Sequence, residues 1–417
     1  MASTILFVHT NFPAQFRHLA RHLAQDPGYD VIAFGSNTAR DIPGVRLFRY
    51  HPHFETAPNV HPFAARFDGE CVRAEQIMYL ATHLRSEGIV PDVIMVHPGW
   101  GEALPLRVVF PTARICAYCE YYFKPRASDL DFDPEFPAFG MDGQVRTNIL
   151  NVTPALALLD ADLGLAPTQW QKETFPAVLQ PMIEVIHDGI DTDEVRPDSR
   201  AALTIDGRTL RAGDEIVTYV ARNLEPYRGI HSFMRAAAKI LRTRPRAQIL
   251  LVGGHGASYG SPAPKGSTWF EIFRREIGGT CDLSRLHALG TLSRADYLNV
   301  LRVSRAHVYL TYPFVPSWSL AEAMAMGCAI VASDTAPVRE FIDSPDNGYL
   351  VSFFDTDAIA SRVIDILAHT ERHDAVRRAA RARAIERFDL NRVSLPKQKK
   401  LIELLARRGQ SRTGERA

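Results

Sequence analysis

Two arginines six residues apart are the strongest candidates for chemistry in this sequence. Arg222 ends an apolar run that begins at Glu215, and Arg228 is followed directly by Gly229 and a helical pattern. Guanidinium groups bind phosphate oxygens through paired hydrogen bonds, and the first turn of a helix adds free N–H groups and the positive end of its dipole. The pattern therefore favours a phosphate site, although an ion pair between Arg228 and a surface carboxylate would fit the same sequence.

A single carboxylate stands in an otherwise apolar helical pattern. The segment 317–327 reads Ser-Trp-Ser-Leu-Ala-Glu-Ala-Met-Ala-Met-Gly and follows the apolar run Ala306–Leu310, so that Glu322 is expected to be buried. A buried carboxylate needs hydrogen-bond donors. The two hydroxyls of a ribose would serve, and so would neighbouring protein side chains, so a binding role and a structural role both remain open.

Two further patterns resemble metal sites but have simpler explanations. Asp129, Asp131 and Asp133 lie in a proline-containing loop, 120–143, which lacks the Gly and the distal Glu of a calcium-binding loop. Cys116 and Cys119 form a CxxC, but positions three apart on a strand face opposite ways. We expect a solvated acidic loop, two unlinked thiols and no metal site.

Short apolar runs alternate with helical patterns along the whole chain. Continuous apolar strands separated by helices predict parallel sheets covered on both faces, and two such sets in series predict two doubly wound α/β domains. The runs are Thr4–His9, Tyr29–Phe34, Val93–His97, Ala113–Tyr118, Ala161–Ala166, Glu184–His187, Glu215–Arg222, Ala247–Gly254, Leu286–Gly290, Ala306–Tyr312, Cys328–Ser333 and Gly348–Phe353.

The domain boundary is expected near residues 190–214, where a polar stretch separates two apolar runs. We predict Rossmann-like domains at 1–195 and 196–388. Ligands bind open α/β sheets at the carboxyl ends of their strands, so that two such domains would place ligands in a cleft between them.

Composition excludes several classes of protein. With 48 Lys and Arg against 47 Asp and Glu the net charge is +1, which gives no field for nucleic acid. The N-terminus lacks a signal-peptide pattern and no run is long enough to span a bilayer, so we expect a cytoplasmic protein with reduced thiols. The segment 372–417 holds 14 Lys and Arg against 5 Asp and Glu, which suits either a solvated helix face or contact with an anionic membrane surface.

The motifs, in their order and spacing, resemble the retaining GT-B glycosyltransferases of family 4, also called group 1. Arg222 with Arg228-Gly229 is similar to the family's diphosphate clamp of Arg and Lys. The other matching segments are Gln248–Gly254, Leu289-Gly290, Glu322–Ser333 and the domain junction Val185–Asp191.

The resemblance implies roles for individual residues. His97, Arg222 and Arg228 would act in catalysis, although a histidine that ends a strand can also be structural. The donor-binding residues would be Arg222, Arg228, Gly253, Gly254, Leu289, Ser317, Trp318, Ser319, Leu320 and Glu322. The acceptor-side residues would be Asn11, Phe12, Trp100 and Glu120.

The resemblance also implies the reaction and the course of the C-terminus. The donor would be a UDP- or GDP-sugar and the acceptor a glycan or lipid-linked hydroxyl, in cell-surface glycan or glycoconjugate synthesis, with neither metal nor cofactor. The leaving phosphate oxygen would take the acceptor proton, so no protein base is needed. A helix at 389–408 would cross back to the first domain, ahead of a disordered tail at 409–417. The oligomeric state stays open.

Three departures from the family pattern keep other functions open. Phe314 stands where the family has the first glutamate of its Glu-x7-Glu motif, Arg228 replaces the clamp lysine one residue late, and the turn after His9 lacks a glycine. A degenerate, non-catalytic sugar-binding or scaffold protein is one alternative. A nucleotide-sugar epimerase is another, and it would convert its nucleotide sugar without any acceptor.

Overall fold

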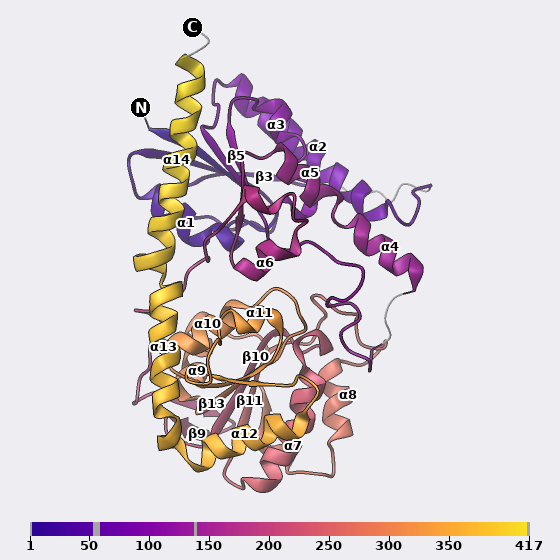
Figure 1. The fold of residues 1–417 in the computed structure, drawn as a ribbon, viewed down its shortest axis with the longest axis vertical. Coiled ribbons are helices and arrows are strands. Elements are labelled where there is room, and N and C mark those ends of the chain that lie inside the picture. The colour runs from indigo at the N-terminus through magenta and orange to yellow at the C-terminus, as the bar shows by residue number, and fades with distance from the viewer. Residues whose placement is uncertain (1, 53–58, 137–139, 415–417) are drawn as a thin grey trace. The chain divides into compact units, whose positions relative to one another are not determined.

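The computed structural model describes residues 2–52, 59–136 and 140–414 of the 417-residue chain, with side chains up to residue 407. The chain forms two compact units (Figure 1). Unit 1 comprises Met1–Gly189 and Asn391–Ala417, and unit 2 comprises Ile190–Leu390.

Unit 1 is built on a seven-stranded parallel sheet in the order β3-β2-β1-β4-β5-β6-β7. The inner strands are buried on both faces, as their continuous apolar sequences predict. The strands are β1 (Ser3–Val8), β2 (Tyr29–Ser36), β3 (Arg46–Tyr50), β4 (Val93–Val96), β5 (Arg114–Tyr118), β6 (Leu163–Ala166) and β7 (Ile183–Val185). The helices are α1 (Arg17–Ala24), α2 (Ala65–Ser86), α3 (Leu106–Val109), α4 (Met141–Ile149), α5 (Val152–Asp160), α6 (Gln169–Thr174) and α14 (Leu395–Gly414).

Unit 2 contains a six-stranded parallel sheet in the order β12-β11-β10-β13-β14-β15. Its strands are β10 (Ile216–Asn223), β11 (Gln248–Gly254), β12 (Leu286–Ala288), β13 (Ala306–Tyr309), β14 (Ala329–Ser333) and β15 (Tyr349–Val351). Its helices are α7 (Ile230–Thr243), α8 (Trp269–Glu276), α9 (Arg294–Val303), α10 (Trp318–Ala325), α11 (Ala336–Arg339), α12 (Thr356–Ala368) and α13 (Asp374–Phe388). The predicted fold class, two doubly wound α/β domains, is confirmed.

Two strand features were not predicted. The edge strand β3 reads Arg-Leu-Phe-Arg-Tyr and is only partly buried, so its apolar residues form no continuous run. A hairpin of β8 (Ala202–Ile205) and β9 (Arg208–Arg211) turns at Asp206-Gly207, with φ of 49° and 76°. An Asp-Gly turn of this kind is a hairpin signal, but it lies in the polar stretch 190–214, where only the domain boundary was expected.

The chain passes from unit 1 to unit 2 earlier than predicted. The expected boundary lies between residues 195 and 196, whereas unit 2 begins at Ile190. The reason is packing, because Ile190 and Val195 belong to the buried core of unit 2. Ile190, the first residue of unit 2, also forms backbone hydrogen bonds with Phe388 and Leu390, the latter being the last residue of the unit. The chain therefore enters and leaves unit 2 at neighbouring points.

The C-terminal helix belongs to unit 1. After a π-helical turn at Leu390–Ser394, α14 packs against α1, β4 and β5, with Pro396 in its first turn, where a missing N–H costs little. Lys399 bonds Asp26 at 2.8 Å. The predicted disorder at 409–417 does not match the helix, which continues to Gly414 because extending an established helix is easier than starting one. Residues 415–417 lie outside the described residues.

Among the described helices, none has the length and apolar character that crossing a membrane requires. Several arginines of the basic segment are bound within unit 2 instead of facing solvent. Arg377 donates to the Gly327 carbonyl at 2.9 Å, and Arg383 donates to the carbonyls of Phe341 and Glu340. These contacts favour the structural interpretation for part of the basic excess.

We predict that Gly229→Ala destabilises unit 2 more than Gly207→Ala does. Both glycines have φ of 76°, but an added Cβ at Gly229 would lie 2.5 Å from Leu310 Cβ, whereas none of the described atoms lies within 4 Å at Gly207. A left-handed φ costs a non-glycine residue about 1–2 kcal/mol, and overpacking adds about 1–3 kcal/mol. Urea denaturation of both variants measures the difference, and equal losses would contradict the packing argument.

Candidate functional site

The two predicted phosphate-binding arginines lie at the carboxyl end of β10, on either side of a tight turn. Arg222 is exposed and forms no ion pair with the described residues. Arg228 ends a short 3-10 turn, and Gly229 links it to α7. Gly229 packs so closely on Leu310 that the Arg228 turn is held against the end of β13.

Arg228 is buried, with 5% of its surface exposed. Its Nη1 donates to Thr311 Oγ1 at 2.8 Å and to the Val315 carbonyl at 3.0 Å. Its Cζ lies 5.0 Å from the ring centroid of Tyr259 and 5.8 Å from that of Phe314, in the range of cation–π attraction. No ion pair joins it to any carboxylate in the described part of the chain, so the alternative of a surface ion pair does not hold.

The charge of Arg228 is retained despite its burial. Burial by itself would lower the pKa of this guanidinium, but the neighbouring phenols of Tyr309, Tyr259 and Tyr227 raise it above its ordinary value. Arg228 is therefore a fixed cation without an anionic partner among the described residues.

The Val315 hydrogen bond joins the arginine turn to the segment that opens α10. Ser317 caps this helix, its Oγ accepting from the Ser319 backbone at 3.3 Å, and its own N–H donates to the Tyr309 hydroxyl at 2.7 Å. Ser317 and Trp318 are half-buried. Ser319 and Leu320 are buried, and their N–H groups bond to Ser317, so this structure leaves little of either residue for the predicted donor contacts.

Glu322 is buried in α10 and has protein partners. One carboxylate oxygen accepts from Arg294 Nη1 and the other from the Tyr297 hydroxyl at 2.5 Å. Arg294 also pairs with Glu194 at 2.9 Å. Glu322 therefore has the structural role that the sequence left open. A ribose could still donate to the same oxygens, because each has more than one lone pair.

The ends of β11 and β12, which carry the candidate donor-binding residues Gly253, Gly254 and Leu289, lie side by side. Gly253 donates its N–H to the Gly290 carbonyl at 3.0 Å, and Leu289 donates to Leu251 at 2.8 Å. A side chain at Gly253 would collide with the Ala221 carbonyl at 2.7 Å, so glycine is needed for this close approach.

His97 lies at the carboxyl end of β4 in unit 1 and is 3% exposed. Its Nδ1 accepts the Gly99 N–H at 3.2 Å, so Nε2 carries the proton and donates to Glu120 Oε2, also at 3.2 Å. The imidazole stacks on Trp100 with a centroid distance of 4.6 Å and on Tyr118 at 5.5 Å. Three of the predicted residues, His97, Trp100 and Glu120, are thus brought together.

His9 was missed as a site residue although it ends β1 beside His97. Its Nδ1 accepts the Asn11 N–H at 2.8 Å, so Nε2 donates to Gln15 Oε1 at 2.9 Å. Gln15 in turn donates to Glu120 Oε1 at 3.2 Å. A continuous chain of hydrogen bonds therefore runs from His9 through Gln15 and Glu120 to His97. The position of His9 at a strand end, the signal used for His97, could have identified it.

The other acceptor-side predictions differ in outcome. Asn11 is exposed, and its side-chain oxygen accepts from Thr38 at 2.5 Å. Phe12 is fully buried against Phe7, so its side chain cannot meet an acceptor in this structure. Phe12 was predicted to contact the acceptor because it lies in the loop after the first strand, and its burial corrects that expectation.

A second polar group at this edge of the unit 1 sheet was not predicted. Glu102 is fully buried, and its Oε1 accepts from Thr10 Oγ1 and from the Tyr50 hydroxyl, the latter at 2.6 Å. Its Oε2 has no partner among the described residues. These residues follow β1, β3 and β4, which are distant in sequence, so no local pattern could reveal the cluster.

The acidic loop is not the solvated loop that was predicted, because Asp129 is 2% and Asp133 5% exposed, whereas Cys116 and Cys119 are unlinked thiols as expected. Asp131 accepts the N–H groups of residues 127 and 128 at 2.9 Å, and Asp129 accepts from the Tyr121 hydroxyl at 2.7 Å. Burial raises the pKa of the Cys116 and Cys119 thiols, to about 12 for Cys119. Within the described ranges, no cluster of three or more His, Cys, Asp or Glu side chains could hold a metal ion.

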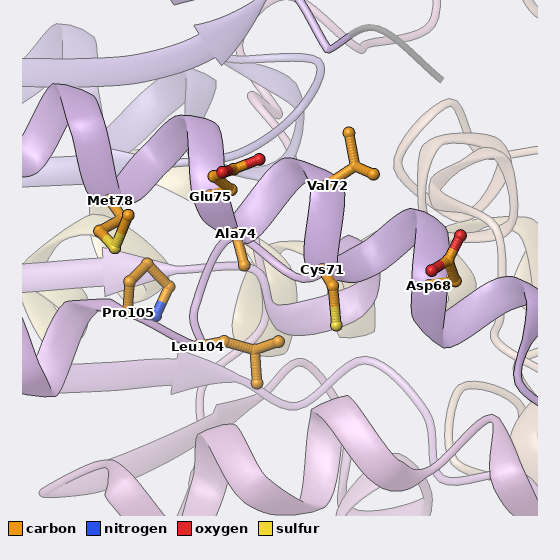
Figure 2. A pocket seen from close by; sticks show the side chains of 8 residues that line it. All are labelled: Asp68, Cys71, Val72, Ala74, Glu75, Met78, Leu104 and Pro105. Carbon is orange, nitrogen blue, oxygen red and sulfur yellow. The ribbon is translucent and has the colours of Figure 1, made fainter. Parts of the chain in front are cut away.

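A pocket of about 480 Å³ lies elsewhere on unit 1 (Figure 2). It is formed by the outward side of α2 and by the turn before α3, and none of the predicted site residues lines it. The lining residues are Asp68, Cys71, Val72, Ala74, Glu75, Met78, Leu104 and Pro105. The pocket is therefore separate from both strand-end groups.

We predict that His9 makes the stability of the protein depend on pH. Burial first, and then the neighbouring His97, lowers the pKa of His9 well below 6.5. Since the unfolded chain takes up this proton and the folded one does not, stability falls as pH decreases below about 6.5, by about 1.4 kcal/mol between pH 7.5 and 5.5. Urea denaturation at both pH values should show a correspondingly smaller change in His9→Gln, and an unchanged pH dependence would contradict this prediction.

Sequence comparison also divides the chain into two parts, with a division between residues 195 and 204 that lies slightly after the start of unit 2 at Ile190. The family model described as Glycosyl transferase family 4 group matches residues 27–195, and that described as Glycosyl transferases group 1 matches residues 204–383. A phosphatidyl-myo-inositol mannosyltransferase of Mycobacterium tuberculosis (strain H37Rv) is 29% identical over 228 residues, 53% of each chain. A D-inositol 3-phosphate glycosyltransferase of Mycobacterium sp. (strain KMS) is 28% identical over 205 residues, 48% of this chain and 43% of that one. The chain thus spans about half the length of the curated relatives it matches.

Solved structures share the fold over nearly the whole chain. Sucrose-phosphate synthase from Thermosynechococcus elongatus superposes with a TM-score of 0.71 at 17% identity, covering 97% of this chain and 99% of that one. Anabaena HepE, solved in complex with UDP, gives 0.63 at 15% identity, covering 97% and 100%. The two Rossmann-like units therefore have the GT-B fold, and with both family models matched, the chain belongs to glycosyltransferase family 4, the group 1 glycosyl transferases.

Proposed function

We propose that this protein transfers a sugar from a UDP- or GDP-sugar to an acceptor hydroxyl, and that Arg222 and Arg228 bind the donor diphosphate. The observation that carries the proposal is the pair of arginines at the end of β10, neither of which forms an ion pair with a carboxylate of the described residues. A cation that is kept without an anionic partner, with its charge intact, suits an anionic ligand.

The surroundings of Arg228 fit a leaving group that gains negative charge. A buried cation acts in a region of low dielectric, where its attraction to phosphate is stronger than in water. The hydrogen bond to Val315 places the start of α10 close by, so the positive end of that helix's dipole would favour the same anion. Glu322, on the same helix, would accept from the ribose hydroxyls.

In the proposed mechanism the sugar is transferred with retention of its anomeric configuration. The bond between the anomeric carbon and the donor phosphate oxygen breaks and the diphosphate leaves with the electron pair. The acceptor oxygen forms the new bond to the anomeric carbon, and the departing phosphate oxygen takes the proton of the acceptor hydroxyl. The arginine pair supplies the positive charge that a metal ion would otherwise provide. No dedicated protein base is required.

The acceptor is proposed from the comparisons. The two groups of relatives are named for phosphatidyl-myo-inositol and D-inositol 3-phosphate, and structural neighbours were solved with UDP or UDP-glucose. These names support myo-inositol, its phosphate and its lipid-linked form as the first acceptors to test, at the cytoplasmic face of a membrane.

A non-catalytic sugar-binding protein is the second candidate function. The observation that favours it is Phe314, which is 6% exposed and packs on Tyr227, with ring centroids 5.1 Å apart, where the family has a carboxylate. In that case the donor would bind without being turned over. Release of nucleoside diphosphate in the presence of an inositol acceptor distinguishes the two functions.

We predict that Arg222→Ala weakens the binding of nucleoside diphosphates without affecting nucleosides. Loss of a charged contact to phosphate costs about 1.5–3 kcal/mol, or about 10- to 150-fold in affinity. A thermal-shift panel of UDP, GDP and their sugars first identifies the base, because a ligand that binds the folded state raises its melting temperature. Calorimetric titration with the matching diphosphate and nucleoside then gives the two affinities.

The matched control is Arg211→Ala, which removes an exposed arginine of β9 in the same unit. It should bind both ligands as the wild type does. Equal loss of diphosphate and nucleoside binding in Arg222→Ala would contradict the proposed diphosphate site.

We also predict that turnover does not require a divalent cation. The rate of nucleoside diphosphate release from the donor should be the same, within about a factor of two, in EDTA and in Mg²⁺ or Mn²⁺, because cationic side chains take the role of the metal. A loss of activity in EDTA that added Mn²⁺ restores would contradict this part of the mechanism.

A further inference from the structure

Glu225, three residues before Arg228, is a fully buried carboxylate to which the sequence analysis assigned no role. Its two oxygens accept the backbone N–H groups of Ser258 at 3.0 and 3.1 Å, Tyr259 at 3.3 Å and Gly260 at 3.2 Å. Hydrogen bonds to an ionised group are stronger than neutral ones. This carboxylate therefore anchors the loop that follows β11.

Asn223 anchors the same loop at a second point. Its Oδ1 accepts the Gly256 N–H at 3.2 Å, and its Nδ2 donates to Ser258 Oγ at 2.5 Å. A Cβ at Gly254 would lie 2.5 Å from Asn223 Oδ1, so only glycine leaves room for this side chain. The loop is thus held to the segment between the two arginines.

The anchored loop fixes Tyr259 over Arg228. The Tyr259 ring lies 5.0 Å from Arg228 Cζ and packs on Phe314 and Tyr227, with ring centroids 4.8 and 5.9 Å apart. Tyr259 is 41% exposed, so burial of its ring cannot alone explain its position. The hydrogen bonds of Glu225 to the backbone of residues 258–260 explain it directly.

We propose that Glu225 and Tyr259 are positioning residues for the donor diphosphate, acting through Arg228; this rests on the diphosphate role proposed for Arg228. Tyr259 contacts the guanidinium through its ring and through a side-chain hydrogen bond, while Thr311 and the Val315 carbonyl hold Nη1. These contacts fix the direction in which the guanidinium presents its remaining N–H groups to phosphate oxygens. Glu225 itself touches no ligand, because its oxygens are occupied by the loop.

The benefit of this arrangement is preorganisation. An arginine side chain gives up considerable rotational freedom when it is immobilised, and this cost falls on binding unless the side chain is already fixed. Because Tyr259 and Glu225 hold Arg228 in place, the rotational entropy of its side chain is lost when the protein folds and not when the ligand binds. Their loss should therefore weaken ligands that contact Arg228, and leave unchanged a nucleoside, which has no phosphate.

The test compares Tyr259→Ala, Tyr259→Phe and Glu225→Gln by calorimetric titration. The probes are UDP and uridine, or GDP and guanosine if the wild type prefers that base. We expect Tyr259→Ala to lower diphosphate affinity by about 3- to 30-fold, the range of a partly desolvated cation–π contact, with nucleoside affinity unchanged. Tyr259→Phe keeps the ring but loses the hydrogen bond that the hydroxyl accepts from Arg228, so its affinity should lie between those of Tyr259→Ala and the wild type. Glu225→Gln should resemble Tyr259→Ala, because a neutral amide holds the loop less firmly.

Two control variants separate positioning from general stability. Glu215→Gln alters another buried carboxylate of unit 2, one bound by Arg244 and Arg246, and Tyr79→Ala removes an exposed ring from α2. Both should keep the wild-type ratio of diphosphate to nucleoside affinity. Since Tyr259 lies at the surface, its variants remain informative even if Glu225→Gln fails to fold.

The outcomes distinguish the two proposals. If the wild type binds the diphosphate and Tyr259→Ala keeps its full affinity, or loses diphosphate and nucleoside affinity equally, the positioning role is overturned and the diphosphate site stands. If the wild type prefers no nucleoside diphosphate over its nucleoside, the proposed function itself fails.

Discussion

The burial of the Arg228 guanidinium without a carboxylate partner is the constraint around which the binding edge of unit 2 is arranged. Taking a cation out of water is costly unless its donors are satisfied. Here Thr311 and the Val315 carbonyl satisfy Nη1, and Tyr259 and Phe314 offer their ring faces. Because these groups come from the ends of β11 and β13, one side chain ties together segments that are far apart in the sequence. An acidic partner would satisfy the same charge, but it would also occupy the group that an anionic ligand needs.

Phe314 makes sense in this setting. Its ring centroid lies 5.8 Å from Arg228 Cζ, so a glutamate at this position would be close enough to compete for the guanidinium. A phenyl ring packs against Tyr227 and Tyr259 and attracts the cation only weakly. Phe314 therefore removes the carboxylate that the family has at this position. It also avoids an ion pair with Arg228, which stands in place of the clamp lysine and would remain able to bind phosphate.

The parts of the fold that could be predicted are those with a local signature. Strands buried on both faces read as continuous apolar runs, and the arginine turn could be recognised from residue type and spacing. The edge strand β3 gives no such run, and the buried state of Phe12 depends on packing that no short pattern encodes. The role of Glu225 rests on partners that only folding brings near, since it bonds residues 33 to 35 positions away. Residue types therefore suggest the candidate binding groups, whereas most of the groups that hold them became visible only in three dimensions.

The basic C-terminal segment shows how a charge pattern can serve a site at a distance. Arg381 on α13 donates to the Ala325 carbonyl at the end of α10 and to the Val195 carbonyl at 3.1 Å, and Arg377 donates to Gly327 just beyond that helix. Cations at a helix C-terminus satisfy its free carbonyls and interact favourably with its dipole. The helix that they stabilise is the one whose first turn carries Ser317 and whose interior carries Glu322. From the sequence, these arginines suggested a solvated helix face or a membrane contact. In the structure, Arg377 and Arg381 stabilise the C-terminal end of α10, while the N-terminal end of the same helix is the one proposed to face the donor.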